Sequence, residues 1–504
     1  MIDREPASDG SGGELKLKVA RTLKWNVIDR VSSQLLYAVT GVVLARMLSH
    51  EDVGLVGAIL VFQAFASLFV DSGFSSALIQ RKNPTRLDYS TVLWFNIAMA
   101  VGLYIILYFA APWVALIFQG DPRLIPLSRV MFLSFIINAT AIVQTNRLMK
   151  RMDVRMVAVS NSLGLFVAAV VGIYLAVTGW GAWAIVWQTI TLAAVKSAVL
   201  WLTGGWTPLM RFSWSVLRSY FSVGSGVMLT SLLTTVFQNI YSFFIGNRAG
   251  LVPLGYFTQA DKWSKMGIMS LSQVLTSSFL PLLSGVQDDR ERFARMCGKT
   301  HRFTSYLVFP AMGLLIVMAT PIFHTLFSTK WDASIALFQI LLLRGVFMVL
   351  SLLYNNYILS LGHSRWLVFI EALRDGIALV AIFVALPYIS LSTDGSPVMG
   401  LRIFLWGQLI ATALTWCVSL VLVSRITGRP LMSYLGDMAP YLAITMLGLL
   451  PAAAIGMLGL HPLLTCICQA TAFAAVYCGV NALLRSRIQS DLFAYLLGRG
   501  LSNS

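Results

Sequence analysis

About fourteen long apolar stretches constrain the fold of this chain more than any other feature of its sequence. A helix needs about 20 mostly apolar residues to cross a hydrocarbon layer ~30 Å thick. The sequence therefore predicts an all-α, polytopic membrane protein with about 14 transmembrane helices. We place the spans near 23–47, 53–80, 88–114, 124–144, 154–177, 182–203, 220–246, 254–284, 303–327, 333–360, 366–390, 400–424, 437–458 and 462–484.

The charge content agrees with lipid as the solvent. Charged residues make up 12% of the 504 residues and hydrophobic residues 57%. A soluble protein carries about 25% charged residues, so this chain lacks the polar surface that would keep it in water. The first apolar stretch is too long for the core of a signal peptide. We expect an uncleaved first helix.

The basic residues predict the orientation. If the N-terminus is cytoplasmic, the outward loops hold only Arg46, Arg123, Arg248 and Lys330, and most other Lys and Arg residues fall in inward loops or at the two ends. Cytoplasmic loops of membrane proteins are enriched in Lys and Arg. We therefore expect both termini in the cytoplasm. The net charge of +16 needs no nucleic-acid partner, because no nucleic-acid-binding motif accompanies it.

Cofactor and metal motifs are not found in the sequence. The five cysteines and five histidines are scattered. Gly298-Lys299-Thr300 resembles the end of a phosphate-binding loop, but Phe293 stands where that motif needs its first glycine. We expect a solvated basic loop over 285–302, no metal, no cofactor and no catalytic residue. Energy would come from a proton or sodium gradient, from the membrane potential, or from a partner protein.

A weak internal repeat predicts the domain organisation. Gly54 and Gly255 are 201 residues apart, and Ser75-Ser76-Ala77-Leu78 resembles Ser277-Ser278-Phe279-Leu280 at an offset of 202. Six helices per half would make this a parallel repeat, as in many two-lobed transporters. The predicted parts are a cytoplasmic segment 1–22, an N-lobe 23–203, a linker 204–219, a C-lobe 220–424, two extra helices over 437–484, and a cytoplasmic tail 485–504.

Polar residues inside the spans are the strongest indication of function. Equivalent helices of the two halves carry polar stripes that include Asp29 and Arg30, Asp71, Gln238, and Gln259 with Lys262. A charge within the membrane usually faces a cavity or a partner. The alternative is that the Ser, Thr and Gln side chains hydrogen-bond between packed helices.

Basic residues in the spans favour an anionic substrate. We expect Arg30, Lys262 and Arg344 to face a hydrated cavity, and Arg129 and Lys196 to snorkel towards the membrane surfaces. Arg forms bidentate bonds to phosphate oxygens and Lys supplies a compact charge, so a pyrophosphate would suit such a cavity. Gln238 and Gln259 are further candidates for substrate binding.

Acidic residues in the spans leave two interpretations open. Glu371, Arg374 and Asp375 lie within about one turn of one helix, and Arg374 can neutralise an acid three residues away. They form either a structural salt bridge or a site that couples transport to protons or cations. Asp29 next to Arg30 allows the same two interpretations, and Asp71 is a further candidate for coupling or gating.

An ordered set of short matches over residues 20–345 carries a family resemblance. The most specific are Asp71-Ser72-Gly73-Phe74 with Ile79-Gln80-Arg81-Lys82, and Lys330-Trp331 before Leu337-Phe338-Gln339-Ile340-Leu341. On these residues the chain resembles the Wzx-type polysaccharide flippases of the multidrug/oligosaccharidyl-lipid/polysaccharide (MOP) exporter superfamily. The resemblance is closest to the branch that includes the colanic acid exporter.

The resemblance implies a fold and a function. The fold would be two six-helix lobes arranged as a V, with two additional C-terminal helices. The function would be alternating-access transport of undecaprenyl-pyrophosphate-linked oligosaccharide repeat units across the bacterial inner membrane, for exopolysaccharide or lipopolysaccharide biosynthesis. Relatives line their cavity with basic residues on the first and eighth helices, which here match Arg30 and Lys262. A polysaccharide polymerase and chain-length proteins would be partners.

Two other functions remain open. A drug or cation antiporter of the same superfamily would depend on Asp29 or Asp71 and would tolerate loss of the basic residues. A polytopic polysaccharide polymerase or glycosyltransferase would be an enzyme and would usually need a large outward loop. The longest outward loop expected here, about 387–400, holds Asp394 as its one charged residue, which weighs against the enzyme.

Overall fold

The chain folds into two compact helical units. A computed structural model describes residues 10–71, 74–389, 398–486 and 488–490, and all regular secondary structure in these ranges is helical. The predicted N-terminal segment, the Asp71–Phe74 stretch and the C-terminal tail are therefore only partly covered. The first unit is Met1–Gly255 and the second unit is Tyr256–Ser504. The prediction of an all-α fold is confirmed.

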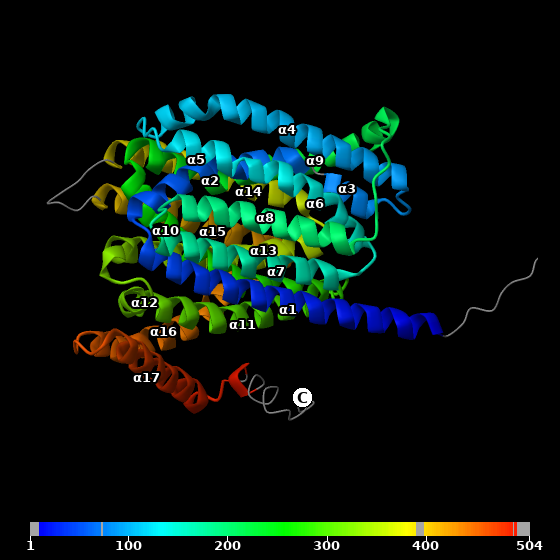
Figure 1. The fold of residues 1–504 in the computed structure, drawn as a ribbon. Coiled ribbons are helices and arrows are strands. Elements are labelled where there is room, and N and C mark those ends of the chain that lie inside the picture. The colour runs from blue at the N-terminus through cyan, green and yellow to red at the C-terminus, as the bar shows by residue number, and fades with distance from the viewer. Residues whose placement is uncertain (1–9, 72–73, 390–397, 487, 491–504) are drawn as a thin grey trace, which may run out of the picture. The chain divides into compact units, whose positions relative to one another are not determined.

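The first unit is built from ten helices or parts of helices among the described residues. These are α1 (Gly10–Met47), α2 (His50–Asp71), α3 (Phe74–Gln80), α4 (Arg86–Ile117), α5 (Leu124–Met131), α6 (Leu133–Lys150), α7 (Val154–Val177), α8 (Trp183–Thr203), α9 (Trp214–Arg248) and the start of α10 (Leu251–Ser284). Figure 1 shows α7 and α8 side by side, with α1 running along α7.

The second unit contains the rest of α10 and the helices that follow it. These are α11 (Arg290–Val317), α12 (Ala319–Leu326), η1 (Thr329–Trp331), α13 (Asp332–Ser360), α14 (Ser364–Ala385), η2 (Leu386–Tyr388), α15 (Met399–Thr427), α16 (Leu431–Gly456) and α17 (Pro462–Leu483). Within this unit, α16 packs against α11 and α17. The unit therefore includes the two helices that the sequence predicts as additions to the repeat.

The predicted number of fourteen spans is not confirmed. Eleven helices of the described chain are long and apolar enough to cross a membrane, or up to 12 if α11 and α12, bent by 61°, form one span. The two remaining predicted spans correspond to α10 and α14, which are helices of 34 and 22 residues. In α14, Glu371, Arg374 and Asp375 lower the apolar character of the helix.

The expected loop over 285–302 is wrong for most of its length, because α11 begins at Arg290. Asp289 caps the helix by accepting a hydrogen bond from the backbone N–H of Arg292 at 3.0 Å. Cys297, Thr300 and His301 are buried. The basic side chains lower the mean hydropathy of this segment, so its hydropathy did not indicate a helix. Burial of one face of the helix stabilises it in the fold.

Two glycines of the predicted repeat make a reciprocal close contact inside the first unit. A Cβ placed on Gly54 would lie 1.9 Å from the carbonyl oxygen of Leu251, and one on Gly255 would lie 1.9 Å from the carbonyl oxygen of His50. No side chain fits at either position. The step of 201 residues that relates the glycines also relates His50 to Leu251, which supports the repeat.

A largely buried polar cluster joins α11, α13 and α16 of the second unit with Arg429, which lies in the connection between α15 and α16. Asp437 of α16 forms ion pairs with Arg302 at 3.1 Å and with Arg429 at 2.6 Å. A Cβ on Gly298 would come within 2.9 Å of the Arg429 guanidinium carbon. The glycine that resembles part of a phosphate-binding loop therefore makes room for a guanidinium.

Aromatic side chains complete this cluster. The Thr300 and Tyr357 hydroxyls are 2.8 Å apart, and His301 Nε2 lies 3.0 Å from the Tyr354 hydroxyl. Tyr434 presents its ring edge to the His301 ring, with 5.2 Å between the ring centroids. We call the side chains of Thr300, His301, Arg302, Tyr354, Tyr357, Arg429, Tyr434 and Asp437 the Asp437 cluster.

Candidate functional site

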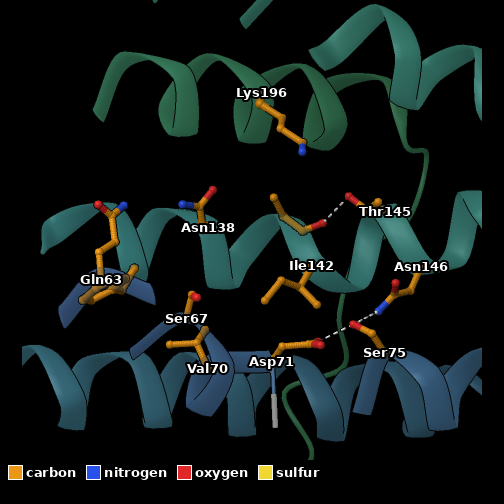
Figure 2. Close-up of a pocket in the computed structure, with 12 residues that line it drawn as sticks. Gln63, Ser67, Val70, Asp71, Ser75, Asn138, Ile142, Thr145, Asn146 and Lys196 are labelled. Atoms are coloured by element: carbon orange, nitrogen blue, oxygen red, sulfur yellow. Dashed lines mark hydrogen bonds between the residues drawn. The ribbon is translucent and has the colours of Figure 1, made fainter. Parts of the chain in front are cut away.

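A polar cavity of about 340 Å³ lies inside the first unit. Figure 2 shows its walls, which come from α2, α3, α6 and α8. Of these helices, α2, α6 and α8 lie in segments long and apolar enough to cross a membrane, so the cavity places polar groups between membrane-spanning segments. The lining residues are Gln63, Ser67, Val70, Asp71, Ser75, Phe135, Asn138, Ala141, Ile142, Thr145, Asn146 and Lys196.

Helical spacing explains one wall of the cavity. Gln63, Ser67 and Asp71 follow one another at steps of four along α2, which places them on one face of the helix. Ser75 of α3 continues the series at the next step of four. The polar stripe seen in the sequence therefore faces a cavity here.

A short hydrogen-bonded chain crosses from this wall to α6. The Ser75 hydroxyl donates to the Asp71 carboxylate, and the Asn146 amide donates to the Ser75 oxygen at 2.7 Å. Figure 2 shows both bonds. Asp71 thus lines the cavity while one of its oxygens is engaged by a neighbouring hydroxyl.

Lys196 is the one cationic side chain among the lining residues that the structure describes. Figure 2 shows it extending from α8 towards α6. The expectation that Lys196 snorkels to the membrane surface is therefore wrong. The sequence did hold a signal: Lys196 lies seven residues before Thr203, where α8 ends, or about two helical turns.

The polar stripe of α1 has a different role from that of α2. The Asn161 amide of α7 donates to Asp29 at 3.1 Å and to the Ser33 hydroxyl at 3.0 Å. The hydroxyls of Ser32 and Ser162 are 2.9 Å apart. These bonds join two packed helices, so the interpretation as interhelical hydrogen bonding holds for this part of α1.

The basic and amide candidates for substrate binding do not gather in this cavity. In the first unit, Arg30 of α1 and Gln238 of α9 are exposed and lie outside the lining. In the second unit, Lys262 of α10 is exposed, with its ammonium 5.6 Å from the centroid of the Trp263 ring. Their joint role in binding a pyrophosphate stays a prediction.

Two candidates of the second unit are packed into protein. Gln259 of α10 is 4% exposed. Arg344 of α13 is half-buried, and its Nε donates to the Thr412 hydroxyl of α15 at 3.3 Å. Thr412 in turn donates to the backbone of its own helix, at the carbonyl of Gln408. Arg344 therefore helps to hold α13 against α15 in this structure.

The charges of α14 pair with one another. Arg374 forms ion pairs with Glu371 and, at 3.0 Å, with Asp375. Both carboxylates are engaged by the same guanidinium, which is the geometry of the salt bridge that the spacing predicts. A coupling role for these three residues stays a prediction.

One set of structural contacts was missed by the sequence reasoning. The Lys150 ammonium, at the end of α6, donates to the carbonyl oxygens of Leu78, Ile79 and Arg81, at 3.3 Å and 2.8 Å for the first two. These carbonyls lie at the end of α3, where backbone acceptors lack partners in the helix. The Ile79–Lys82 stretch of the family resemblance therefore has a packing role.

The fold and the cavity define a class: an all-helical, multi-pass membrane protein with polar groups held at membrane depth. The chain belongs to the polysaccharide biosynthesis protein family, whose model matches residues 43–336. The resemblance recognised in the sequence is confirmed.

Individual relatives agree with this assignment. The chain is 26% identical over 317 residues to the succinoglycan biosynthesis transport protein ExoT of Rhizobium meliloti (strain 1021), an alignment that covers 62% of this chain and 63% of that protein. It is 23% identical over 341 residues to the lipopolysaccharide biosynthesis protein WzxC of Escherichia coli (strain K12), covering 66% and 68%.

A solved structure shares the fold across nearly the whole chain. The lipid II flippase MurJ, in an inward closed conformation, superposes with a TM-score of 0.72 at 15% sequence identity. The match covers 95% of this chain and 100% of that one. The chain therefore shares the fold of that structure.

Proposed function

We propose that this chain is a flippase and not an enzyme. It would move undecaprenyl-pyrophosphate-linked oligosaccharide repeat units from the cytoplasmic to the periplasmic leaflet by alternating access. One observation carries the proposal: a chain of the polysaccharide biosynthesis family has the fold of a lipid II flippase over 95% of its length. The polar cavity of the first unit supports it, because a glycan headgroup needs hydrogen-bonding groups at membrane depth.

Charge chemistry supports an assignment of residues to the substrate. Arg30 and Lys262, with Arg344, would bind the pyrophosphate, since Arg and Lys match phosphate oxygens. Gln238 and Gln259 would hydrogen-bond to the glycan. The polyprenyl tail is too apolar for a polar path and would stay in lipid.

The energy source would be a proton or sodium gradient or the membrane potential, without a cofactor. Asp71 is the acid best placed for coupling, because it lines the cavity. Asp29 is a second candidate. Glu371 and Asp375 would act only if Arg374 released them, since that guanidinium pairs with both.

The cellular setting follows from the loop charges and from the pathway. The protein would lie in the bacterial inner membrane with both termini in the cytoplasm, because the inward loops hold most of the basic residues. A polysaccharide polymerase and chain-length proteins would receive the repeat units on the periplasmic side.

A reconstituted flipping assay tests the function. Proteoliposomes that contain the full chain should move a fluorescent polyprenyl-pyrophosphate-linked glycan between leaflets, and protein-free vesicles should not. Arg30→Ala and Lys262→Ala should each slow the movement without loss of folded protein. Lys265→Ala is the matched control for Lys262→Ala, because Lys265 is on the same helix and is ion-paired to Asp261 at 2.6 Å. Equal rates with protein and without it would exclude the proposal.

A further inference from the structure

The cavity of the first unit holds a cation that has no contact partner among the residues that the structure describes. Lys196 lines it, and no described side chain or carbonyl lies within hydrogen-bonding or ion-pair distance of the Lys196 ammonium. The carboxylate on the opposite wall, Asp71, is bonded to Ser75 instead. A charge held at membrane depth without a contact partner is costly, so such residues usually serve a ligand or a transport path.

Asp29 of α1 and Lys196 of α8 both contact α7. Asn161 and Gly164 are three residues apart on α7 and therefore share a face of that helix. Asn161 binds the Asp29 carboxylate, and a Cβ on Gly164 would lie 3.4 Å from the Cβ of Lys196. Asp29 and the base of the lysine thus converge on one face of α7.

The Asp29 charge acts on Lys196 without touching it. The interaction of the two charges is attractive, although the two groups are not in ion-pair contact. Asp29 is fixed in place by Asn161 and by the Ser33 hydroxyl, which donates to it at 3.4 Å. Asp29 therefore offsets only part of the cost of burying the Lys196 ammonium, whose donors remain available on the cavity side.

We propose that Lys196 binds an anionic group of the transported glycolipid in this cavity, and that Asp29 is the counter-charge with which the ligand competes. The proposal rests on the flippase function. Asp29 acts as a positioning residue, because it interacts with Lys196 only by long-range electrostatic attraction and does not contact the ligand. Binding of the anion to Lys196 of α8 would weaken the attraction between Lys196 and Asp29 of α1. The packing of α1 would therefore depend on whether the cavity is occupied.

The size of the cavity limits what enters it. At about 340 Å³ it is at the small end of ligand pockets. It takes an anionic group with the sugar next to it, rather than a whole repeat unit. The anion has two sources in a lipid-linked glycan: the pyrophosphate linkage and an acidic sugar.

Binding to the purified full-length chain distinguishes the sources. The probes are farnesyl diphosphate, which carries the pyrophosphate without sugar, and a glucuronic acid-containing disaccharide without lipid. Lys196→Gln should weaken binding of the probe that carries the correct anion by about tenfold or more, as expected for a lost charge-assisted contact. Lys196→Arg, which keeps the charge, should retain binding to within about threefold.

Asp29→Asn gives the distinctive result. Removing the competing charge should strengthen binding of the same probe by about threefold to tenfold. This gain in affinity should vanish in the double variant Asp29→Asn/Lys196→Gln. A structural role for Asp29 predicts weaker binding instead. Melting temperatures of all variants verify folding, and Lys196→Arg keeps the test valid if Lys196→Gln does not fold.

Three outcomes would overturn the proposal: wild-type protein that binds neither probe, Lys196→Gln that binds both as wild type does, or a gain from Asp29→Asn that persists without Lys196. Flipping by the wild-type chain with unchanged Lys196→Gln binding would leave the flippase function intact and reject this site. If the chain shows the expected binding pattern but moves no lipid-linked glycan, the binding site stands and the flippase function is rejected.

Discussion

The polar interiors of the two units differ in how their charges are satisfied. In the second unit, Asp437 neutralises Arg302 and Arg429 directly, and hydroxyl and imidazole groups pair with one another around them. In the first unit, Lys196 faces a cavity with no contact partner among the described residues. Charged groups that satisfy one another stabilise a fold, whereas a charge left facing a cavity is available to a ligand.

The largest effect is expected from disrupting the Asp437 cluster. Asp437→Ala leaves two guanidinium groups without their carboxylate, and loss of one partner of a buried charge network costs ~3 kcal/mol. The free energy of unfolding of the purified protein should fall by about that amount. Glu291→Ala is the control, because its partner Arg295 lies in an exposed pair worth ~0–1 kcal/mol. Equal stability of the two variants would mean that the Asp437 cluster is not a structural network.

The next effect concerns the tightest packing of the first unit. Gly54→Ala places a methyl group against the carbonyl of Leu251 and should cost ~1–3 kcal/mol or more, because backbone must move to admit it. Gly102→Ala is the matched control, since nothing lies within 4 Å of a Cβ at that helical position. Thermal unfolding in detergent measures both. A neutral Gly54→Ala would show that the two helices can separate there without cost.

A substitution in the cavity should have the opposite effect to one in the Asp437 cluster: it should reduce transport and leave stability nearly unchanged. Lys196→Gln removes a charge that has no contact partner in the described part of the chain, so the free energy of unfolding should change by less than ~1 kcal/mol while flipping slows strongly. Chemical unfolding and the flipping assay, on the same preparation, separate the two effects. A loss of stability as large as that of Asp437→Ala would make Lys196 a structural residue and remove the contrast.

The smallest effect is on the loop that precedes α5. Hydrogen bonds from Arg123 hold the pKa of Asp121 below its ordinary value. A lowered pKa in the folded state stabilises the protein above the ordinary pKa of the carboxyl group, and the gain is lost as pH falls through the lowered pKa. The exposed pair contributes less than ~1 kcal/mol. Asp121→Asn should therefore be slightly less stable than wild type at pH 7, and the difference should vanish once the pH falls below the lowered pKa of Asp121.

The fold was largely predictable because lipid imposes its own pattern on a sequence. Apolar length located the helices, and α7 matches its predicted range of 154–177. The breaks were not predictable in this way. The 61° bend between α11 and α12 falls inside the span predicted at 303–327, and the region predicted as a basic loop is mostly the start of α11. Hydropathy averages over such short features.

The site was predictable only in part, because periodicity shows that polar residues share a face but not what that face meets. The stripe on α2 faces a cavity, whereas the stripe on α1 meets Asn161 and Ser162 of α7. Lys196 was misplaced for the same reason. Its neighbours come from α2, α6 and α7, and the sequence does not show how these helices pack around α8.

Photocrosslinking tests the central contrast most directly. A polyprenyl-pyrophosphate-linked glycan with a photoreactive group on its first sugar would be bound to the full chain, irradiated, and mapped by mass spectrometry of the labelled peptides. We expect label on the α6 segment that lines the cavity, around Asn138 and Thr145, and no label there in Lys196→Gln. Label on the His301 region of α11, with the α6 segment unlabelled in an actively flipping protein, would contradict this expectation.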